Sequence, residues 1–295
     1  MTTMPVTAVS ANGSSVRALG RIETKRLARH PVFLLGFVAT AFFLATSLNS
    51  ASFDYYNITI VPGFFMGLFS TVAMFRLTRS MEKAQPAVDS SPVTQQERVL
   101  ALCLATVLPA VVGLLSFGAI LAFQGASEPL AYGSFDSADR VAVLFGETVI
   151  ACIGGPLLGV AAGRWLRFPG ASALLFVGLL FWVLLGEGLT DSSGAARWST
   201  AIRMSAPWAQ FTAVTTEDHE LQQWNGSPWW YLGWLVALCV LALLGALLKG
   251  AEGDDRRRIV RTGALVGAGG LVCCVLAVVL GPDSVVYTPG SVKPF

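Results

Sequence analysis

Charged residues are scarce in this chain of 295 residues, since Asp, Glu, Lys and Arg together make up only 13% of it. Average soluble domains carry roughly 25% charged residues, and they need that charge to cover their surface. The apolar share of 54% is in turn too high for a disordered chain. The composition therefore excludes both an ordinary soluble domain and a disordered chain.

The chain also lacks an excess of charge of one sign, with 20 Lys and Arg against 18 Asp and Glu. A net charge of +2 gives no indication of a nucleic-acid partner. The five cysteines lie inside apolar runs and not in polar loops, so they do not have the placing of a disulfide framework in a secreted domain. They are Cys103, Cys152, Cys239, Cys273 and Cys274.

Motifs that carry catalytic chemistry are absent from the sequence. It has no Gly-x-x-x-x-Gly-Lys-Ser/Thr phosphate-binding loop, no His-Glu-x-x-His, no Gly-x-Ser-x-Gly and no Cys-x-x-Cys. Its two histidines, His30 and His219, lie far apart. We therefore expect no catalytic residue, no metal site and no enzymatic activity in this chain. A membrane enzyme built on carboxylates is the remaining enzymatic alternative.

Long apolar runs are what the chain has in abundance. A helix that crosses about 30 Å of hydrocarbon needs about 20 apolar residues, at about 1.5 Å per residue. Windows without charge predict six such helices, and a seventh contains only Glu147. No run alternates between polar and apolar residues like a barrel strand. The predicted fold class is all-α, a polytopic transmembrane bundle of six to seven spans. The predicted helices lie near 32–49, 59–76, 99–122, 141–162, 169–188, 229–248 and 260–280.

The positions of the basic residues predict how the bundle is oriented. If the N-terminus is cytoplasmic, all but four of the 20 Lys and Arg fall on the cytoplasmic side. With seven crossings the C-terminus then lies outside. We expect no cleavable signal peptide, because the first apolar run follows a polar segment of about thirty residues. The four outer basic residues are Arg140, Arg197, Arg203 and Lys293.

The segment 14–30 predicts an amphipathic helix that lies along the inner leaflet. Its basic residues recur every four positions and share one face, with apolar residues opposite. The helix should end before Pro31, since a residue that precedes proline avoids the helical conformation. An ordinary basic flank would explain the charge equally well, but not this periodicity. The basic residues are Arg17, Arg21, Lys25 and Arg29.

The cytoplasmic loop 76–98 is longer than a connecting turn. Pro86 and Pro92 should interrupt any helix there, and Thr94 and Glu97 have the spacing of a capping box that begins a helix continuous with the third span. The loop therefore predicts a docking element for a cytoplasmic partner, and a passive linker is the alternative.

The outer segment 190–228 is too apolar for a solvent-exposed loop and too charged for a full span. It predicts short helices that lie on or dip into the outer leaflet. The aromatic residues that follow predict a belt at the membrane boundary. They are Trp224, Trp229, Trp230 and Tyr231.

Two features inside the fourth predicted span stand out. An ionised Glu147 at this depth would cost up to about 2.5 to 3.5 kcal/mol, so it either lines a polar cavity or is neutralised or snorkels to the surface. Gly155, Gly159 and Gly163 form a smooth stripe for close helix contact, within the chain or between two chains.

Four stretches of sequence, in this order, resemble the membrane subunit of an ABC transporter, specifically the exporter-type permease found in actinobacteria, with the type V exporter fold. The resemblance extends over about residues 14–250. The stretches are Arg29-His30-Pro31; Ser91-Pro92-Val93-Thr94 with Glu97-Arg98; Gly155-Pro-x-x-Gly-x-x-x-Gly-Arg-Trp165; and Ala206-Pro207-Trp208 with Trp230-Tyr231.

The resemblance implies a flexible N-terminus at 1–13, an elbow helix at 14–30 and a six-helix permease domain at 31–250 with re-entrant outer helices before the sixth span. The additional span and outer tail at 251–295 depart from the family pattern. It also implies a coupling element within 78–91 that docks on a separate ATPase. We expect Arg79 and Glu82 at that contact, and Thr94 and Glu97 in the cap behind it.

The function that follows from the resemblance is efflux: a permease subunit of an ATP-driven exporter in the bacterial plasma membrane. Its expected partners are an ABC ATPase that binds ATP and Mg, a second permease chain in a homodimer or heterodimer, and membrane lipid. No cofactor is expected in this chain itself. The alternative is a membrane-embedded regulatory or assembly protein that recruits a cytoplasmic partner.

Overall fold

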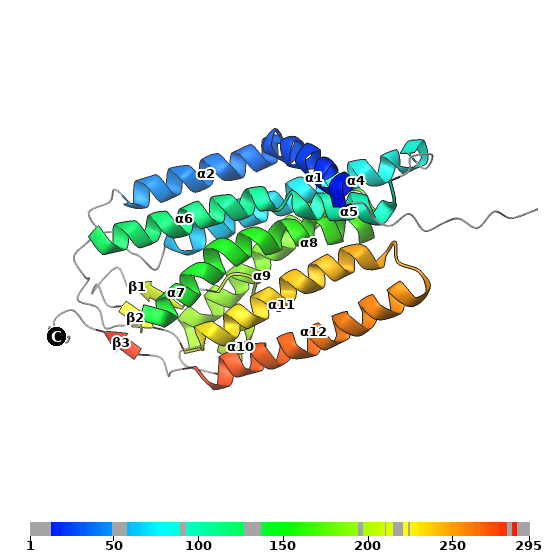
Figure 1. Cartoon of the computed structure of the whole chain (residues 1–295). Helices are drawn as coiled ribbons and strands as arrows, with labels where there is room; N and C mark the ends of the chain where they lie inside the picture. The colour runs from blue at the N-terminus through cyan, green and yellow to red at the C-terminus, as the bar shows by residue number, and fades with distance from the viewer. Residues whose placement is uncertain are drawn as a thin grey trace, which may run out of the picture.

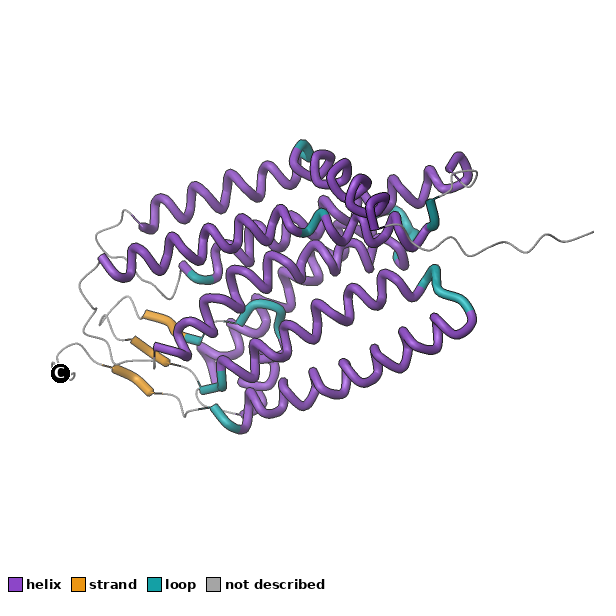
Figure 2. Tube along the Cα trace, in the orientation of Figure 1, coloured by secondary structure: helices purple, strands orange, loops and turns teal. Residues whose placement is uncertain are grey.

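The computed structural model is built almost entirely from long helices that run side by side (Figures 1 and 2). The structure describes residues 13–48, 58–88, 93–126, 137–193, 197–209, 211–214, 221–223, 225–281 and 285–287. Its helical character confirms the predicted helical bundle.

The N-terminal region forms two helices that meet at a sharp corner. Helix α1 (Gly13–Ala28) lies across one end of the bundle, and α2 (Pro31–Leu48) runs along it (Figure 1). The corner falls at His30, whose backbone N–H bonds to the carbonyl of Leu27 at 2.9 Å. Pro31 then occupies the first position of α2, where a missing N–H costs no helical hydrogen bond.

Six further long helical segments follow the corner in the described part of the chain, and two of them contain a π-helical turn. The π-turn η1 (Pro62–Gly67) leads into α4 (Leu68–Val88), and η2 (Gly146–Ile150) joins α7 (Ser137–Phe145) to α8 (Ala151–Trp165). The others are α5 (Gln95–Leu104) with α6 (Val107–Ala126), α9 (Ala171–Ser193), α11 (Pro228–Leu248) and α12 (Gly253–Val279); a short helix, α10 (Arg197–Ser205), precedes α11.

Five helices in the described part of the chain are long and apolar enough to cross a membrane. The apolar part of α9, Ala171–Gly186, is shorter, and the η1–α4 segment is not among the five. The chain is therefore compatible with a multi-pass membrane protein, while six to seven crossings stay a prediction. The five are Pro31–Leu48, Gln95–Phe123, Ala138–Trp165, Pro228–Leu248 and Gly253–Val279.

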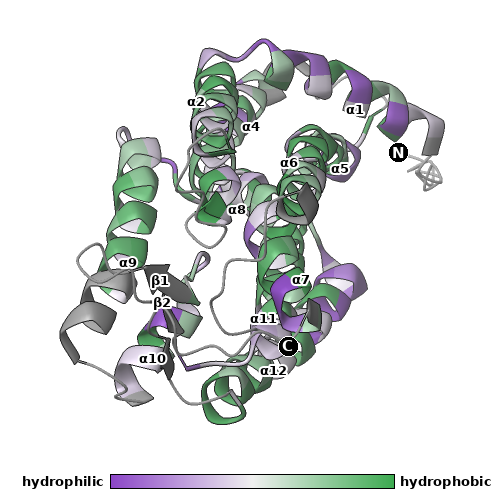
Figure 3. Ribbon diagram, turned by 90° about the vertical axis from the view of Figure 1, so that its left-hand side faces the viewer, coloured by the Kyte–Doolittle hydropathy of each residue, from purple (hydrophilic) through white to green (hydrophobic). Residues whose placement is uncertain are grey.

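The helices consist largely of apolar residues, which the ribbon in Figure 3 shows in green, and many of these residues are exposed. Side chains such as Val38, Phe181 and Leu265 are more than half exposed. Soluble monomers rarely expose contiguous apolar surface on this scale. A hydrocarbon environment removes that cost, so this surface supports insertion in a bilayer.

The two ends of the bundle differ. Helix α1 lies at one end, together with the turn between α11 and α12; we call it the elbow end (Figure 1). At the opposite sheet end, β2 (Leu221–Gln223) pairs antiparallel with β1 (Thr212–Val214) and with β3 (Val285–Tyr287). The prediction did not include this small sheet, because three-residue strands carry no period that a sequence could reveal. Helix α12 thus returns the chain to the end opposite α1; which end is cytoplasmic stays a prediction.

Helix α8 is central, and its glycine stripe faces η1 and α4. A Cβ added to Gly159 would overlap the backbone carbonyl of Thr71, and one added to Gly163 would lie 2.9 Å from the carbonyl of Phe75. The two helices therefore touch backbone to backbone. The hydroxyl of Thr71 donates to the carbonyl of Gly67 at 2.8 Å within its own helix, so it needs no partner across this contact.

Candidate functional site

Three features of the bundle are candidates for a functional site. They are a buried contact at Glu147, an ionic cluster around Glu82 and an apolar cavity.

The buried contact at Glu147 lies where the two π-turns meet. Glu147 belongs to η2 and is 1% exposed, and the hydroxyl of Thr59 donates to its Oε2. A Cβ added to Gly63 of η1 would lie 2.5 Å from the backbone carbonyl of Glu147. A π-turn inside a helix is frequently found at functional sites. The carboxylate is held within the bundle and does not snorkel to the surface.

A buried arginine close to this contact carries the opposite charge. Arg203 of α10 is 1% exposed, donates to the backbone carbonyl of Asn225 and lies 5.5 Å above the ring of Phe211. Burial lowers the pKa of Arg203 to about 10, and the charges of Tyr231 and Glu147 oppose this shift. The guanidinium stays charged at pH 7. The sequence predicts Arg203 only as one of four outer basic residues and gives no sign that its side chain is buried.

Two side chains of α11 hold the segment around Arg203 by hydrogen bonds to its backbone. The hydroxyl of Tyr231 donates to the carbonyl of Ala206 at 2.9 Å, and the indole of Trp234 donates to Ser205 at 3.4 Å. Tyr231 is 1% exposed, so it packs inside the bundle and is not part of the predicted aromatic belt. Trp229 and Trp230 are exposed, and Trp224 lies outside the described residues.

The ionic cluster joins three helices at the elbow end through the carboxylate of Glu82. Its Oε1 lies 3.3 Å from Arg164 Nε, and its Oε2 lies 3.2 Å from Lys249 Nζ and 3.7 Å from Arg167 Nη2. We call these four residues the Glu82 cluster. One carboxylate faces three cations, so the cluster has a surplus of positive charge.

Two residues of the Glu82 cluster are buried within the bundle. The side chains of Glu82 and Arg164 are 6% and 1% exposed, whereas Arg167 is 66% exposed. Arg164 also donates to the carbonyl of Ala246 at 2.6 Å, which ties α8 to α11. Burial lowers the pKa of Lys249, and its hydrogen bond to Glu82 opposes this shift. The carboxylate of Glu82 thus lies inside the bundle, and its predicted place at a contact with an ATPase stays a prediction.

The capping residues predicted before the third span occupy the start of α5. The backbone N–H of Glu97 bonds to Thr94 Oγ1 at 3.2 Å, and the N–H of Thr94 bonds to Glu97 Oε2 at 2.8 Å. Helix α5 then reaches Leu104, and a break at 105–106 separates it from α6. Pro109 explains the break, since it has no N–H for the carbonyl four residues earlier and its ring clashes with that carbonyl.

The predicted coupling element is in large part the end of α4. That helix continues through Pro86 to Val88, so the expected interruption at Pro86 is wrong. Pro86 has no N–H for the carbonyl of Glu82, and its ring crowds that carbonyl, yet the helix extends two residues beyond it. Arg79 donates to the backbone carbonyl of Arg167 at 3.3 Å. Residues 89–92, including Pro92, lie outside the described part of the chain.

The elbow helix presents its basic residues to the outside. Leu27 is fully buried, and a Cβ added to Gly20 would lie 3.2 Å from Leu104 Cβ, so the other face packs on α5. At the corner, burial lowers the pKa of His30, and the charge of Arg76 lowers it further. The exposed basic residues are Arg17, Arg21, Lys25 and Arg29.

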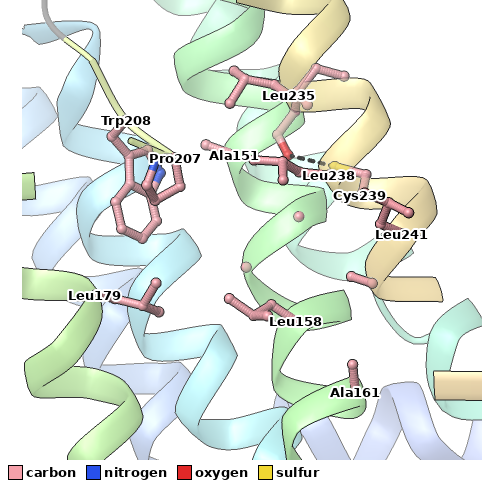
Figure 4. Close-up of a pocket in the computed structure, with 14 residues that line it drawn as sticks. Ala151, Leu158, Ala161, Leu179, Pro207, Trp208, Leu235, Leu238, Cys239 and Leu241 are labelled. Atoms are coloured by element: carbon pink, nitrogen blue, oxygen red, sulfur yellow. Dashed lines mark hydrogen bonds between the residues drawn. The ribbon is translucent and has the colours of Figure 1, made fainter. Parts of the chain in front are cut away.

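An apolar cavity of about 360 Å³ lies between α8, α9 and α11 (Figure 4). Pro207 and Trp208, which follow α10, are among its lining residues. The thiol of Cys239 points to the carbonyl of Ile150 at 3.8 Å across its wall. Glu147 is not among the lining residues, although Ile150 and Ala151 are, so the described cavity is not the polar one considered for this carboxylate.

Comparisons with models of protein families, with curated proteins and with solved structures find no match to this chain. Among the residues that the structure describes, no group of three His, Cys, Asp or Glu side chains could hold a metal ion. The geometry of the three features above is therefore the basis for a functional proposal.

Glu147→Gln tests whether the buried carboxylate matters for function. The change preserves the shape of the side chain and the contact with Thr59 but removes the charge that faces Arg203. Ionisable residues inside a membrane protein usually serve a function. We expect the purified chain to retain its fold and any transport activity in reconstituted vesicles to fall. Unchanged transport, with Thr46→Ala on the exposed face of α2 as the control, would assign Glu147 a purely structural role.

Proposed function

We propose that the chain is the transmembrane permease subunit of an ATP-driven exporter, and that it couples to a separate ATPase at the elbow end. The observation that carries the proposal is the Glu82 cluster, because it links the end of α4 to α8 and α11. Both of these helices line the apolar cavity. A displacement at the end of α4 would therefore reach the walls of the cavity through buried ion pairs.

The sequence also supports a separate ATPase subunit. Without a phosphate-binding loop, the chain can use ATP only through contact with a subunit that has one. Such contact does work only if it distinguishes two conformations of the permease. The end of α4 and the capped start of α5 border residues 89–92 on both sides, at the end of the bundle where α1 lies (Figure 1).

The remaining features have defined places in this proposal. The exposed basic face of α1 would rest on the anionic inner leaflet of a bacterial plasma membrane, with the N-terminus cytoplasmic. The apolar outer faces of the helices would contact lipid and a second permease chain. α10 and the sheet would close the outer side of the pathway, in the place of the re-entrant helices that the resemblance implies.

Thr94→Ala tests the coupling. The variant loses the side-chain cap of α5 and with it about 1 kcal/mol of local stability. We expect the complex with the ATPase to assemble and ATP hydrolysis to continue, while the amount transported per ATP falls. Transport and hydrolysis would be measured together in vesicles.

Thr46→Ala is the matched control for this change. The hydroxyl of Thr46 is exposed on α2 and bonds to the carbonyl of Phe42 within its own helix at 2.9 Å. Its removal should leave the ratio of transport to hydrolysis unchanged. An equal ratio in Thr94→Ala would show that the cap plays no part in coupling.

A further inference from the structure

The apolar cavity has walls from three helices and a lining without charge. Its lining residues include Leu158 of α8, Leu179 of α9 and Leu241 of α11 (Figure 4). Among the described residues that line it, none carries a charged side chain. Its volume of about 360 Å³ falls within the range of roughly 300 to 1,000 Å³ that holds small ligands. A polar ligand would lose its hydration here without gaining hydrogen bonds.

The shape of the cavity is elongated along α8. Lining residues of that helix extend from Ala151 to Ala161, which corresponds to about 15 Å at about 1.5 Å per residue. Trp208, which is 2% exposed, is also part of the lining. A linear hydrocarbon chain has the length and the chemistry to occupy such a space.

The Glu82 cluster lies just beyond one end of this cavity. Ala161 and Ala242 are the lining residues closest to the elbow end along α8 and α11. Arg164 follows Ala161 by about one turn, and its guanidinium donates to the carbonyl of Ala246, one turn beyond Ala242. The apolar lining therefore ends about one helical turn, roughly 5 Å, before Arg164, and about two turns, roughly 10 Å, before Arg167 and Lys249.

The accessible charges of the cluster are suited to an anion. Arg164 is buried and engaged with Glu82 and Ala246, whereas the side chain of Arg167 is 66% exposed. Lys249 is 17% exposed and already donates to Glu82 and to the carbonyl of Arg164, which leaves one of its three N–H donors for a ligand. Glu82 supplies one negative charge for the three cations. A guanidinium and an ammonium with this surplus can each donate to a carboxylate or a phosphate.

We propose that the cavity binds the hydrocarbon chain of an anionic amphiphile, a lipid-like molecule with its acidic head group at Arg167 and Lys249. The binding of such a molecule does not depend on the proposed function. That the molecule is also the exported cargo rests on the proposed function. Charge and apolar surface would then be recognised together, so neither a free anion nor an uncharged hydrocarbon should bind as well.

The test uses the purified full chain in detergent and cis-parinaric acid, a fatty acid that becomes fluorescent in apolar surroundings. Saturable binding of the acid is expected. Leu158→Trp should fill the cavity and weaken binding about tenfold or more, a loss of about 1.4 kcal/mol. Ala242→Leu fills the same space from α11 with a smaller side chain and should act in the same direction. Leu174→Trp adds the same indole at a position that is 61% exposed on α9 and should change nothing.

The head-group contact is tested with the methyl ester of the same acid and with Arg167→Gln. The unmodified chain should bind the ester several-fold more weakly than the acid. In the Arg167→Gln variant the affinities for the acid and for the ester should be nearly equal. Inorganic phosphate should not compete at concentrations that saturate the acid. Equal binding by the Leu158→Trp and Leu174→Trp variants, or equal binding of acid and ester to the unmodified chain, would overturn the proposal.

The result is independent of the proposed transport function, because binding is measured without an ATPase. Binding with the expected pattern, but without ATP-dependent movement of the acid across vesicles, would retain the site and reject the exporter. ATP-dependent transport that Leu158→Trp does not affect, with no saturable binding of the acid, would retain the exporter and reject the site.

Discussion

Replacing Glu82 by Gln is expected to destabilise the chain by about 3 to 5 kcal/mol, because it leaves a buried guanidinium without its counter-charge. The side chain of Arg164 is 1% exposed and cannot turn to water without disturbing the contact between α8 and α11. Loss of the fold would be measured as a lowered midpoint of thermal unfolding of the purified protein in detergent.

Glu23→Gln is the matched control for this prediction. Glu23 pairs with Arg26 at 2.9 Å on α1, where the side chain of Arg26 is 42% exposed. An exposed pair contributes less than about 1 kcal/mol, so this variant should unfold close to the unmodified chain. The double variant Glu82→Gln with Arg164→Met should recover part of the lost stability, since the orphaned charge is then gone. If Glu82→Gln were as stable as Glu23→Gln, the Glu82 cluster could not link the three helices.

Replacing Gly159 by Ala is expected to force α8 away from α4. The added methyl group would overlap the backbone carbonyl of Thr71, and a backbone atom cannot give way as a flexible side chain can. Overpacking of this kind costs about 1 to 3 kcal/mol or more, which outweighs the gain of up to about 1 kcal/mol from replacing a helical glycine. The unfolding midpoint in detergent should fall, and the apolar cavity beside α8 should change shape.

Gly178→Ala on α9 separates the two effects. A Cβ there meets nothing within 4 Å, so only the gain in helix propensity remains. This variant should be as stable as the unmodified chain or slightly more stable. Equal stability of the Gly159→Ala and Gly178→Ala variants would show that the glycine stripe does not set the spacing between α8 and α4.

The helices could be predicted from the sequence because the signal for each is local. A run of about 20 apolar residues identifies its own span whatever its neighbours are, and Thr94 with Glu97 identifies the start of α5 from a spacing of three. The boundaries were less accurate where two local signals compete. At Pro86 the expected interruption is wrong, because the helix continues for two residues beyond the proline. At α12 the helix begins at Gly253, before the apolar run, and Asp254 and Asp255 stabilise that first turn.

The partners of the polar side chains could not be predicted, because each joins segments far apart in the chain. Glu82 lies in a stretch of basic residues that suggests an exposed contact, whereas its partners Arg164 and Lys249 come more than 80 residues later. The same holds for Thr59 and Glu147. A single sequence gives the residue types but not which helices are neighbours.

Some of the residues predicted to contact a membrane or a partner are exposed, and others are buried. The exposed face of α1 leaves Arg17, Arg21, Lys25 and Arg29 available for a membrane or a partner. Lys83 on α4 is exposed beside the buried Glu82, so it is better placed than Glu82 to meet another protein. The ATPase contact itself stays a prediction.

The most direct test of the proposed coupling is a crosslink from the end of α4. Lys83→Cys and, as a control, Arg256→Cys are placed in a chain without other cysteines and co-expressed with a phosphate-binding-loop ATPase from the same source. Both positions are exposed at the elbow end, but Arg256 lies on α12, away from α4. We expect a crosslink to the ATPase from Lys83→Cys whose yield changes when ATP is trapped, and a weaker one from Arg256→Cys whose yield does not change. Equal yields from the two positions, unaffected by ATP, would contradict coupling through the end of α4.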